Sequence, residues 1–301
     1  MEKINKTALV YLLGVSLFYG LLIVIQKMGL NFGIDPLLFS FLRSLIIIPL
    51  SIILFFPQLK KLRFVKKHKL GELFILGVAS SIGILVLFFG QNMTTAVNAG
   101  FLIRLTPLFV IPFSYILLKE KPSNNSIFFM FVMLVGAFLL TTNGKMETLQ
   151  LGDLLIFFVA GIVAFQNVLA KRIMRNVPTD VVIFFRIFIS SILIILIVPV
   201  FLKVKIEHMN YEYFGYITIT AILYILSVIC QYRAIKLVGP FITTTLFLIG
   251  SLFSAGFAYL LLGETLSLVQ WLGASAILIG GIFLIKKYNN NNNKPEKSIE
   301  I

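Results

Sequence analysis

Apolar runs alternate with short polar segments along the chain, and each run has about the 20 residues that an α-helix needs to cross a bilayer. The pattern predicts ten transmembrane helices, at residues 7–28, 36–56, 70–90, 98–118, 127–142, 151–171, 181–201, 213–235, 240–262 and 267–286. The longest polar connection, residues 57–69, is too short to fold alone. We therefore expect an all-α integral membrane protein without a soluble domain.

A constant step separates matching residues in the two halves of the chain. Three pairs share it, with steps of 144, 143 and 144 residues respectively: Glu120 and Glu264, Arg43 and Arg186, and Gly136 and Gly280. Five spans are an odd number, so the second set must enter the membrane with the opposite orientation. The sequence predicts two inverted five-helix repeats, at 7–142 and 151–286, followed by a disordered tail at 287–301. Inverted repeats around a midplane site are typical of alternating-access transporters.

Composition and charge agree with this topology. Hydrophobic residues make up 59% of the chain, charged residues 13%, and the mean hydropathy is +1.00. If the loops alternate between the two sides, nineteen lysines and arginines lie on one side and four on the other. The positive-inside rule then places both termini in the cytoplasm, with the protein in the plasma (inner) membrane. Topology thus explains the net charge of +14, and we expect membrane lipid as a partner and no nucleic acid.

The order of the motifs resembles the drug/metabolite transporter superfamily, in its ten-span type built from two EamA domains. The resemblance covers residues 7–286 and rests on the paired arginines and glutamates, on Pro107 in the fourth span, and on the glycine-rich fifth and tenth spans. It implies an inner-membrane carrier of small metabolites, often an exporter of amino acids and related compounds. It also implies that the fifth and tenth spans are peripheral.

Residues kept in both repeats are most simply explained by the scaffold. Glu120 and Glu264 end their spans, so we interpret them as loop anchors, with a gating role as the alternative. Arg43 and Arg186 lie roughly 8–10 Å into the membrane at 1.5 Å per residue. Each costs about 2.5–3.5 kcal/mol there and needs polar partners. Structural pinning and substrate contact both stay open for these two arginines.

Arg104 has no counterpart in the second repeat, where the position falls near Phe247 or Leu248. Pro107 follows three residues later and frees a helical carbonyl. An arginine beside such a bend predicts a site for a carboxylate or phosphate. Snorkelling to the outer interface, or a bond to a neighbouring helix, is the alternative. Because Ser251 replaces Pro107 in the second repeat, we expect the ninth span to be straighter than the fourth.

Other polar side chains within the spans are candidates for substrate contacts, with packing or the membrane interface as the alternative. They are Tyr11, Tyr19, Gln91, Asn92, Gln166 and Tyr224. Gly136 and Gly280 predict close helix packing. The face of the tenth span that carries Gly273 and Gly280 also suggests a homodimer contact.

No acidic residue falls near the middle of a predicted span, and both histidines lie in loops. We therefore expect uniport or exchange rather than proton coupling, with a carboxylate at a span end, such as Glu120, Asp153 or Glu264, as the alternative proton carrier. A sodium site built from backbone carbonyls and hydroxyls is a further alternative. The sequence also lacks metal-ligand spacings, phosphate loops and nucleophile motifs, so we expect no enzyme activity, no metal and no cofactor. The predicted function is export of small polar metabolites such as amino acids or their derivatives. Transport of S-adenosylmethionine or a nucleoside-type solute, or flipping of a lipid-linked solute, is the alternative.

Overall fold

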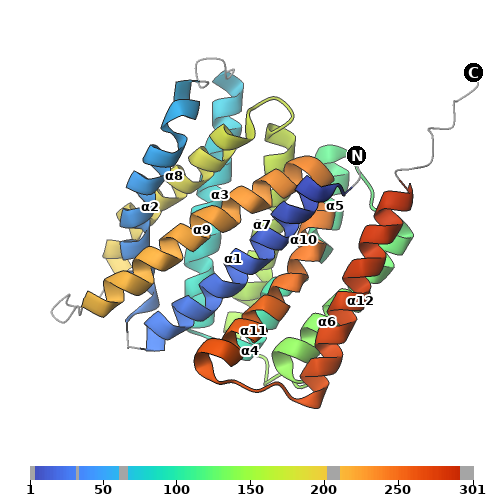
Figure 1. The fold of residues 1–301 in the computed structure, drawn as a ribbon. Coiled ribbons are helices and arrows are strands. Elements are labelled where there is room, and N and C mark those ends of the chain that lie inside the picture. The colour runs from blue at the N-terminus through green and yellow to red at the C-terminus, as the bar shows by residue number, and fades with distance from the viewer. Residues whose placement is uncertain (1–3, 32–33, 61–66, 202–210, 292–301) are drawn as a thin grey trace, which may run out of the picture.

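The computed structural model describes residues 4–31, 34–60, 67–201 and 211–291, and every regular element in these ranges is a helix (Figure 1). The first half contains α1 (Lys6–Asn31), α2 (Pro36–Leu59), α3 (Lys67–Gln91), α4 (Ala96–Leu102), η2 (Ile103–Leu105), α5 (Thr106–Leu118) and α6 (Asn124–Thr142). The second half contains α7 (Leu151–Ile173), α8 (Thr179–Phe201), α9 (Tyr211–Val238), α10 (Pro240–Leu246), η3 (Phe247–Ile249), α11 (Gly250–Leu262) and α12 (Leu268–Asn291). Ten helical spans in the described ranges are long and apolar enough to cross a membrane, as predicted.

The helices begin and end at residues suited to those positions. Asp35 accepts hydrogen bonds from the backbone N–H groups of Leu37 and Leu38 at the start of α2. At the other end of a span, Lys119 (φ 60°) and Gly263 (φ 70°) adopt the left-handed conformation that closes α5 and α11. These two caps are 144 residues apart, so the repeat extends to the backbone of its turns.

The packing of the helices follows the inverted repeat. In the first half α1 packs against α9 and α11, and in the second half α7 packs against the equivalent α3 and α5. α2 packs against its equivalent α8, and α6 against its equivalent α12. The two halves are therefore interleaved rather than placed side by side as separate domains. The end of the bundle at which α1 begins and α12 ends is called the terminal face below, and the opposite end the far face (Figure 1).

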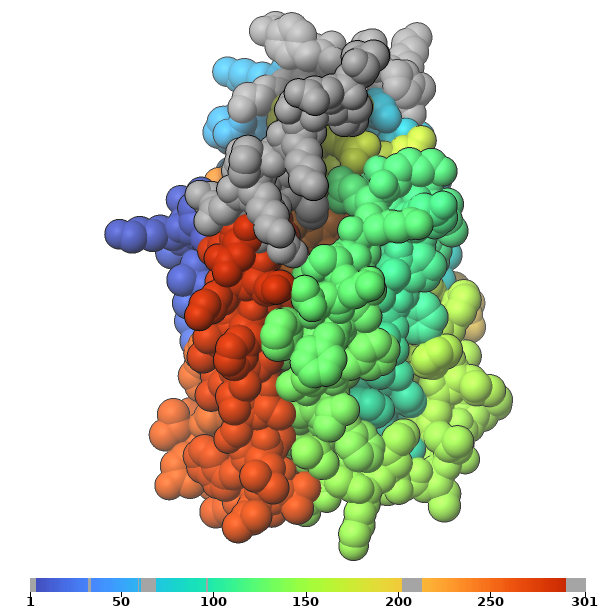
Figure 2. Space-filling model, turned by 90° about the vertical axis from the view of Figure 1, so that its right-hand side faces the viewer, coloured from blue at the N-terminus to red at the C-terminus, as the bar shows by residue number. Residues whose placement is uncertain are grey.

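α6 and α12 form a pair at one edge of the bundle, as the family resemblance implies (Figures 1 and 2). Their backbones touch where Gly136 meets Gly273. A Cβ atom on Gly273 would lie 2.6 Å from the carbonyl oxygen of Gly136, and one on Gly136 would lie 2.7 Å from the carbonyl oxygen of Gly273. A Cβ on Gly280 would lie 2.7 Å from Met133 Cγ. The small-residue face of α12 thus packs within the chain, and a homodimer stays a prediction.

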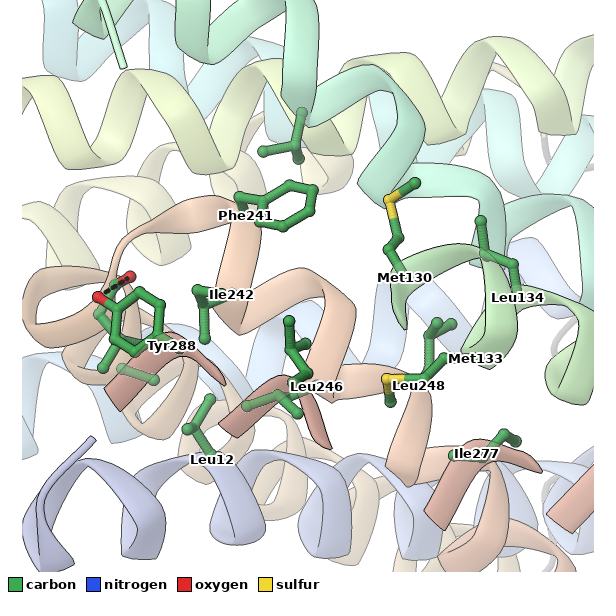
Figure 3. Close-up of a cluster of buried hydrophobic side chains, with 14 of the residues drawn as sticks. Leu12, Met130, Met133, Leu134, Phe241, Ile242, Leu246, Leu248, Ile277 and Tyr288 are labelled. Carbon is green, nitrogen blue, oxygen red and sulfur yellow. Dashed lines mark hydrogen bonds between the residues drawn. The ribbon is translucent and has the colours of Figure 1, made fainter. Parts of the chain in front are cut away.

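A buried apolar cluster connects this pair to the rest of the bundle (Figure 3). Met130 and Met133 of α6 and Ile277 of α12 lie on one side of it, and Leu246 of α10 and Leu12 of α1 complete it. Helices in a bilayer gain little from the hydrophobic effect when they associate, so tight van der Waals packing of this kind holds them together.

Gly273→Ala is expected to destabilise the α6–α12 pair, because its methyl group would overlap backbone atoms that cannot move aside. Overpacking of this kind costs about 1–3 kcal/mol. We expect a melting temperature several degrees below the wild type in detergent. Gly256→Ala on α11 is the matched control, since nothing lies within 4 Å of a Cβ atom at that position. Equal melting temperatures for the two variants would contradict the packing described here.

The fourth and ninth spans are both interrupted by a three-residue 3-10 turn, η2 in one and η3 in the other. The prediction of a straighter ninth span was wrong. Pro107 is the second residue of α5, yet Gly250 and Ser251 begin α11 at the equivalent place without a proline. α1 packs closely against this second break, since a Cβ on Gly20 would lie 3.1 Å from the carbonyl oxygen of Gly250.

The end of the chain also differs from its prediction, because α12 continues to Asn291. Tyr288 is buried, and its hydroxyl donates to the carbonyl oxygen of Val238 at 3.3 Å. The side chain of Asn289 exchanges two hydrogen bonds, of 2.8 and 3.4 Å, with the backbone of Ile4. The predicted tail was therefore wrong for residues 287–291, and its remainder, 292–301, lies outside the described residues.

Candidate functional site

Arg43 lies on α2 and is buried, with 7% of its surface exposed. Its Nη1 donates to Gln26 Oε1 of α1 at 3.0 Å, and its guanidinium carbon lies 5.4 Å from the centre of the Tyr224 ring on α9. No described residue accepts a hydrogen bond from its Nε. Neutral groups from both halves of the chain therefore surround this charge.

Arg186 holds the equivalent position on α8. Its Nε donates to Ser80 Oγ of α3 at 3.1 Å, its Nη2 lies 3.5 Å from Gln166 Oε1 of α7, and its guanidinium carbon lies 5.1 Å from the centre of the Tyr232 ring. Ser80 and Tyr224 are 144 residues apart, so each of the symmetric arginines contacts the same repeat position in the opposite half. Nη1 of Arg186 is buried, without a hydrogen-bond partner in the described ranges.

Arg104 lies in η2, so the break in the fourth span sets its position. Its Nη1 donates to Ser251 Oγ at the start of α11, across the two halves. The carbonyl oxygen of Ile103, which Pro107 leaves free of its helical partner, accepts hydrogen bonds from the backbone N–H and, at 2.7 Å, the hydroxyl of Thr106. That carbonyl is therefore satisfied within the chain, and the anion-binding capacity of this segment rests on Arg104.

Tyr19 lies near the middle of α1, close enough to Arg104, Arg43 and Arg186 for their charges to act on its hydroxyl. Its ring packs edge-on against Phe247 of η3 with 4.9 Å between ring centres. The three arginines and Tyr19 together are called the arginine site below. The arginine site draws on spans one, two, four and seven, with neighbours from spans three, six, eight and nine.

Unsatisfied polar atoms gather in and around the arginine site. Buried atoms there without a hydrogen-bond partner among the described residues are Arg43 Nε, Arg104 Nε, Arg186 Nη1, Tyr224 Oη, Tyr232 Oη and Asn167 Nδ2. Buried polar groups in folded proteins are otherwise almost always paired. In the part of the chain that the structure describes, no salt bridge joins any of the three arginines to a carboxylate. The arginine site therefore carries uncompensated positive charge and free donors.

Gln166 is a predicted site residue that the structure places beside Arg186. It is buried, accepts from Ser80 Oγ at 3.0 Å, and donates to the carbonyl oxygen of Ala79 at 3.0 Å. These bonds fix its Oε1 beside Arg186. Gln166 thus holds Arg186 in place, and it connects α7 to α3.

The structure does not bring three other predicted contacts into the arginine site. Tyr11 accepts from Arg233 Nη1 at 3.3 Å, and Arg233 in turn bonds to Asp180 at 2.9 Å, toward the terminal face. Gln91 and Asn92 are exposed at the far-face end of α3, about 16 Å along the helix from Ser80. Tyr11 and Tyr19 are eight residues apart and therefore share a face of α1, as predicted. They lie about 12 Å apart along the helix, so they do not reach the same site.

Glu120 and Glu264 each form an ion pair with the opposite half of the chain. Glu120 pairs with Arg175 at 3.0 Å beyond the terminal-face end of α5. Glu264 pairs with Lys27 of α1 at 2.6 Å at the far face. The symmetric glutamates thus join the two halves at opposite ends of the bundle, which a loop anchor within one half would not do.

An apolar groove of about 650 Å³ lies between α3, α5 and α7. Its lining residues are Ala79, Ile82, Phe109, Phe113, Leu154, Phe157, Phe158, Gly161, Ile162 and Phe165. Ile82, Leu154 and Phe158 are exposed, so the groove opens on the side of the bundle. Ala79 and Phe165 immediately precede Ser80 and Gln166 in the sequence, so the groove runs close to the contacts of Arg186.

Several residues that contact the three arginines or Tyr19 were not predicted. They are Gln26, Ser80, Tyr232, Phe247 and Ser251. The repeat step held a signal for two of them, because Ser80 is equivalent to Tyr224 and Ser251 to Pro107. Serine and glutamine are common at helix interfaces, so residue type alone did not separate the others from packing residues.

Comparison with known proteins gives consistent results. The family model described as the EamA-like transporter family matches residues 6–142 and 150–286. An uncharacterized transporter of Clostridium kluyveri is 28% identical, over 95% of this chain and 94% of that protein. The uncharacterized transporter YyaM of Bacillus subtilis is 24% identical, over 93% and 95%. One solved structure, 15% identical, aligns with a TM-score of 0.77 over 96% of this chain and all of its own, which shows a shared fold.

Proposed function

Because this chain belongs to the EamA-like transporter family, we propose that it is an alternating-access carrier of a small polar metabolite bearing a carboxylate. An amino acid or an amino acid derivative has this chemistry. Arg104 and Arg43 hold the carboxylate in this proposal. Tyr19 and Tyr224 flank the remainder of the substrate, and no residue has a catalytic role.

The observation that carries the proposal is the free donor set of the arginine site. Arg104 Nε and Arg43 Nε are buried N–H groups without a partner in the described chain, and no carboxylate neutralises either residue there. A guanidinium fork matches a carboxylate in charge and geometry. A scaffold arginine would instead be expected to have its donors satisfied by neighbouring helices.

We place the carrier in the plasma (inner) membrane with the terminal face toward the cytoplasm. The excess of lysine and arginine on that side supports the orientation. Export is the proposed direction, by analogy with the family. Because the mid-span region predicted from the sequence contains no carboxylate or histidine, uniport or exchange is proposed rather than proton coupling.

The groove between α3, α5 and α7 favours a lipid-linked solute as the second candidate substrate. Such a substrate needs a lateral opening for its tail, and the groove has an apolar wall that opens on the side of the bundle. Its head group would then reach Arg186 past Ser80 and Gln166. A nucleoside-type solute such as S-adenosylmethionine has support only from the aromatic rings of Tyr19 and Tyr224, and its sulfonium charge is unfavourable beside three arginines.

A ligand screen tests the proposal. Purified wild type and Arg104→Ala are melted with amino acids, acidic amino acid derivatives, S-adenosylmethionine, nucleosides, lipid-linked phosphates and cationic dyes. A ligand that binds only the folded protein raises its melting temperature with concentration. We expect a carboxylate-bearing metabolite to stabilise the wild type and not the variant. Stabilisation only by cations or lipid-linked compounds, or an undiminished shift in Arg104→Ala, would overturn the proposal.

The two inter-half ion pairs are proposed to bias the carrier toward opposite openings. An exposed pair contributes about 0.2–1 kcal/mol, which corresponds to a population shift of up to about fivefold. Glu120→Gln is expected to favour opening at the terminal face, and Glu264→Gln at the far face. The readout is labelling of Tyr224→Cys, in a Cys230→Ser background, by an impermeant maleimide added to one side. The same direction of change in both variants would contradict this assignment.

A further inference from the structure

The arginine site carries three positive charges, whereas the single carboxylate of the proposed substrate neutralises one of them. The proposed function uses Arg104 and Arg43, and leaves Arg186 with a buried, unpartnered Nη1 and with neutral neighbours only. A buried charge that lacks a counter-ion costs several kcal/mol. This cost falls when a bound ligand carries enough negative charge to pair with Arg186 as well as with Arg104 and Arg43. Arg186 therefore has to be explained together with the substrate rather than as a separate scaffold residue.

The arrangement of the arginines gives the site two positive poles. Arg43 lies seven residues, about 10 Å, from the far-face end of α2, and Arg186 lies seven residues from the terminal-face end of α8. Tyr19 lies between them near the middle of α1. Arg104, eight residues into the fourth span, approaches from the far-face side with Arg43. One pole is therefore Arg43 with Arg104, and the other is Arg186.

The contacts of Arg186 leave a donor available to a ligand. Ser80 and Gln166 occupy Nε and Nη2, and the Tyr232 ring lies 5.1 Å from the guanidinium carbon. Gln166 is fixed in turn by Ser80 and Ala79, so the orientation of Arg186 is set before any ligand arrives. A positioned guanidinium with one free buried N–H is suited to a second anionic group.

We infer that the arginine site takes a small dianion, with one acidic group on Arg104 and Arg43 and the second on Arg186. The inference rests on the proposed function and narrows its substrate class to small molecules with two separate acidic groups, such as dicarboxylates. Arg186 becomes a specificity-determining residue, because it separates a dianion from a monoanion of the same shape.

Matched ligand pairs test the inference on the purified full chain. Succinate is compared with monomethyl succinate, and glutarate with monomethyl glutarate, by calorimetry or thermal shift. We expect at least one dianion to bind the wild type at least tenfold more tightly than its monoanionic partner. The pair that shows the larger difference indicates which spacing of the two acidic groups the site prefers.

The variant Arg186→Gln is expected to lower dianion affinity at least tenfold and monoanion affinity by less than threefold. Arg172→Gln, at an exposed arginine near the end of α7, is the control that changes neither. If monoanions bind the wild type as tightly as dianions, the inference is overturned while the proposed carboxylate site stands. If no anion of either kind binds, both the inference and the proposed function fail. If Arg186→Gln does not fold, the comparison of dianion and monoanion affinities in the wild type still tests the inference.

Discussion

Replacing Arg104 with glutamine is expected to raise the melting temperature of the empty protein while abolishing its response to anions. An arginine within a transmembrane helix costs about 2.5–3.5 kcal/mol on membrane-insertion scales. The bond from Arg104 to Ser251, which is lost in the variant, returns about 1.5–3 kcal/mol as a hydrogen bond to a charged group. Removing one of three uncompensated charges also relieves repulsion. The net gain is on the order of 1 kcal/mol, or about 2 °C.

A higher melting temperature together with lost anion binding shows whether Arg104 binds a ligand or acts as a structural tether between helices. A tether holds α11 to η2, so its removal would lower the melting temperature of the empty protein. The measurement is thermal unfolding in detergent with and without the anion selected by the screen. Arg172→Gln serves as the control, because it removes an exposed arginine outside the arginine site. A lower melting temperature for Arg104→Gln than for this control would show that Arg104 is a tether.

Placing a carboxylate at Ser251 is expected to block the arginine site from within. Ser251 is buried, and its Oγ already accepts from Arg104. An aspartate in its place would pair with Arg104 and compete with any anionic ligand at the same donors. Because breaking a buried charge pair costs about 2–5 kcal/mol, we expect Ser251→Asp to weaken anion binding at least about 30-fold.

Ser251→Asn is the control for this prediction, since it has almost the same shape and no charge. We expect Ser251→Asn to bind the anion with an affinity within about fivefold of the wild type. We expect the empty Ser251→Asp protein to have a higher melting temperature than the wild type and Ser251→Asn. Titration of each purified variant with the selected anion measures both effects. Equal affinities in Ser251→Asp and Ser251→Asn would mean that the anion does not use Arg104.

The repeat was the part of the fold that the sequence predicted best. Apolar run lengths and the 144-residue step were sufficient for ten spans and an inverted arrangement, because both follow from bilayer thickness and an odd span count. The break in the ninth span was missed because it was attributed to Pro107 alone. The serine at position 251 gave no sign of the break, and the close packing of Gly20 against Gly250 exists only in the folded bundle.

The arginine site was predicted in part. Arg104 was identified because it has no repeat counterpart, and Arg43 because an intramembrane charge is costly. The convergence of Arg186 with them depends on the interleaving of the halves, which spacing along one helix does not encode. The same limit explains why the prediction for Tyr11 failed. Its helix face was predicted correctly, but it lies nearer the terminal face, where it accepts a hydrogen bond from Arg233.

The surroundings of the three arginines also differ from the well-packed core of the bundle. Elsewhere the bundle is held by close backbone approaches, as at Gly136 and Gly273, which need no ligand. In the arginine site, charges and donors are kept without partners at a cost in stability. Sites that bind ligands commonly keep such a cost because the ligand repays it on binding.

Exchange in proteoliposomes tests the central claim, that the arginine site carries an anionic metabolite across the membrane. Vesicles with equal amounts of wild type or Arg104→Gln are loaded with unlabelled succinate or alanine, and entry of the labelled compound is followed. The account predicts entry through the wild type well above that in protein-free vesicles, and at least tenfold slower entry through Arg104→Gln. Entry at the same rate through both proteins, or no entry of either compound through the wild type, would contradict it.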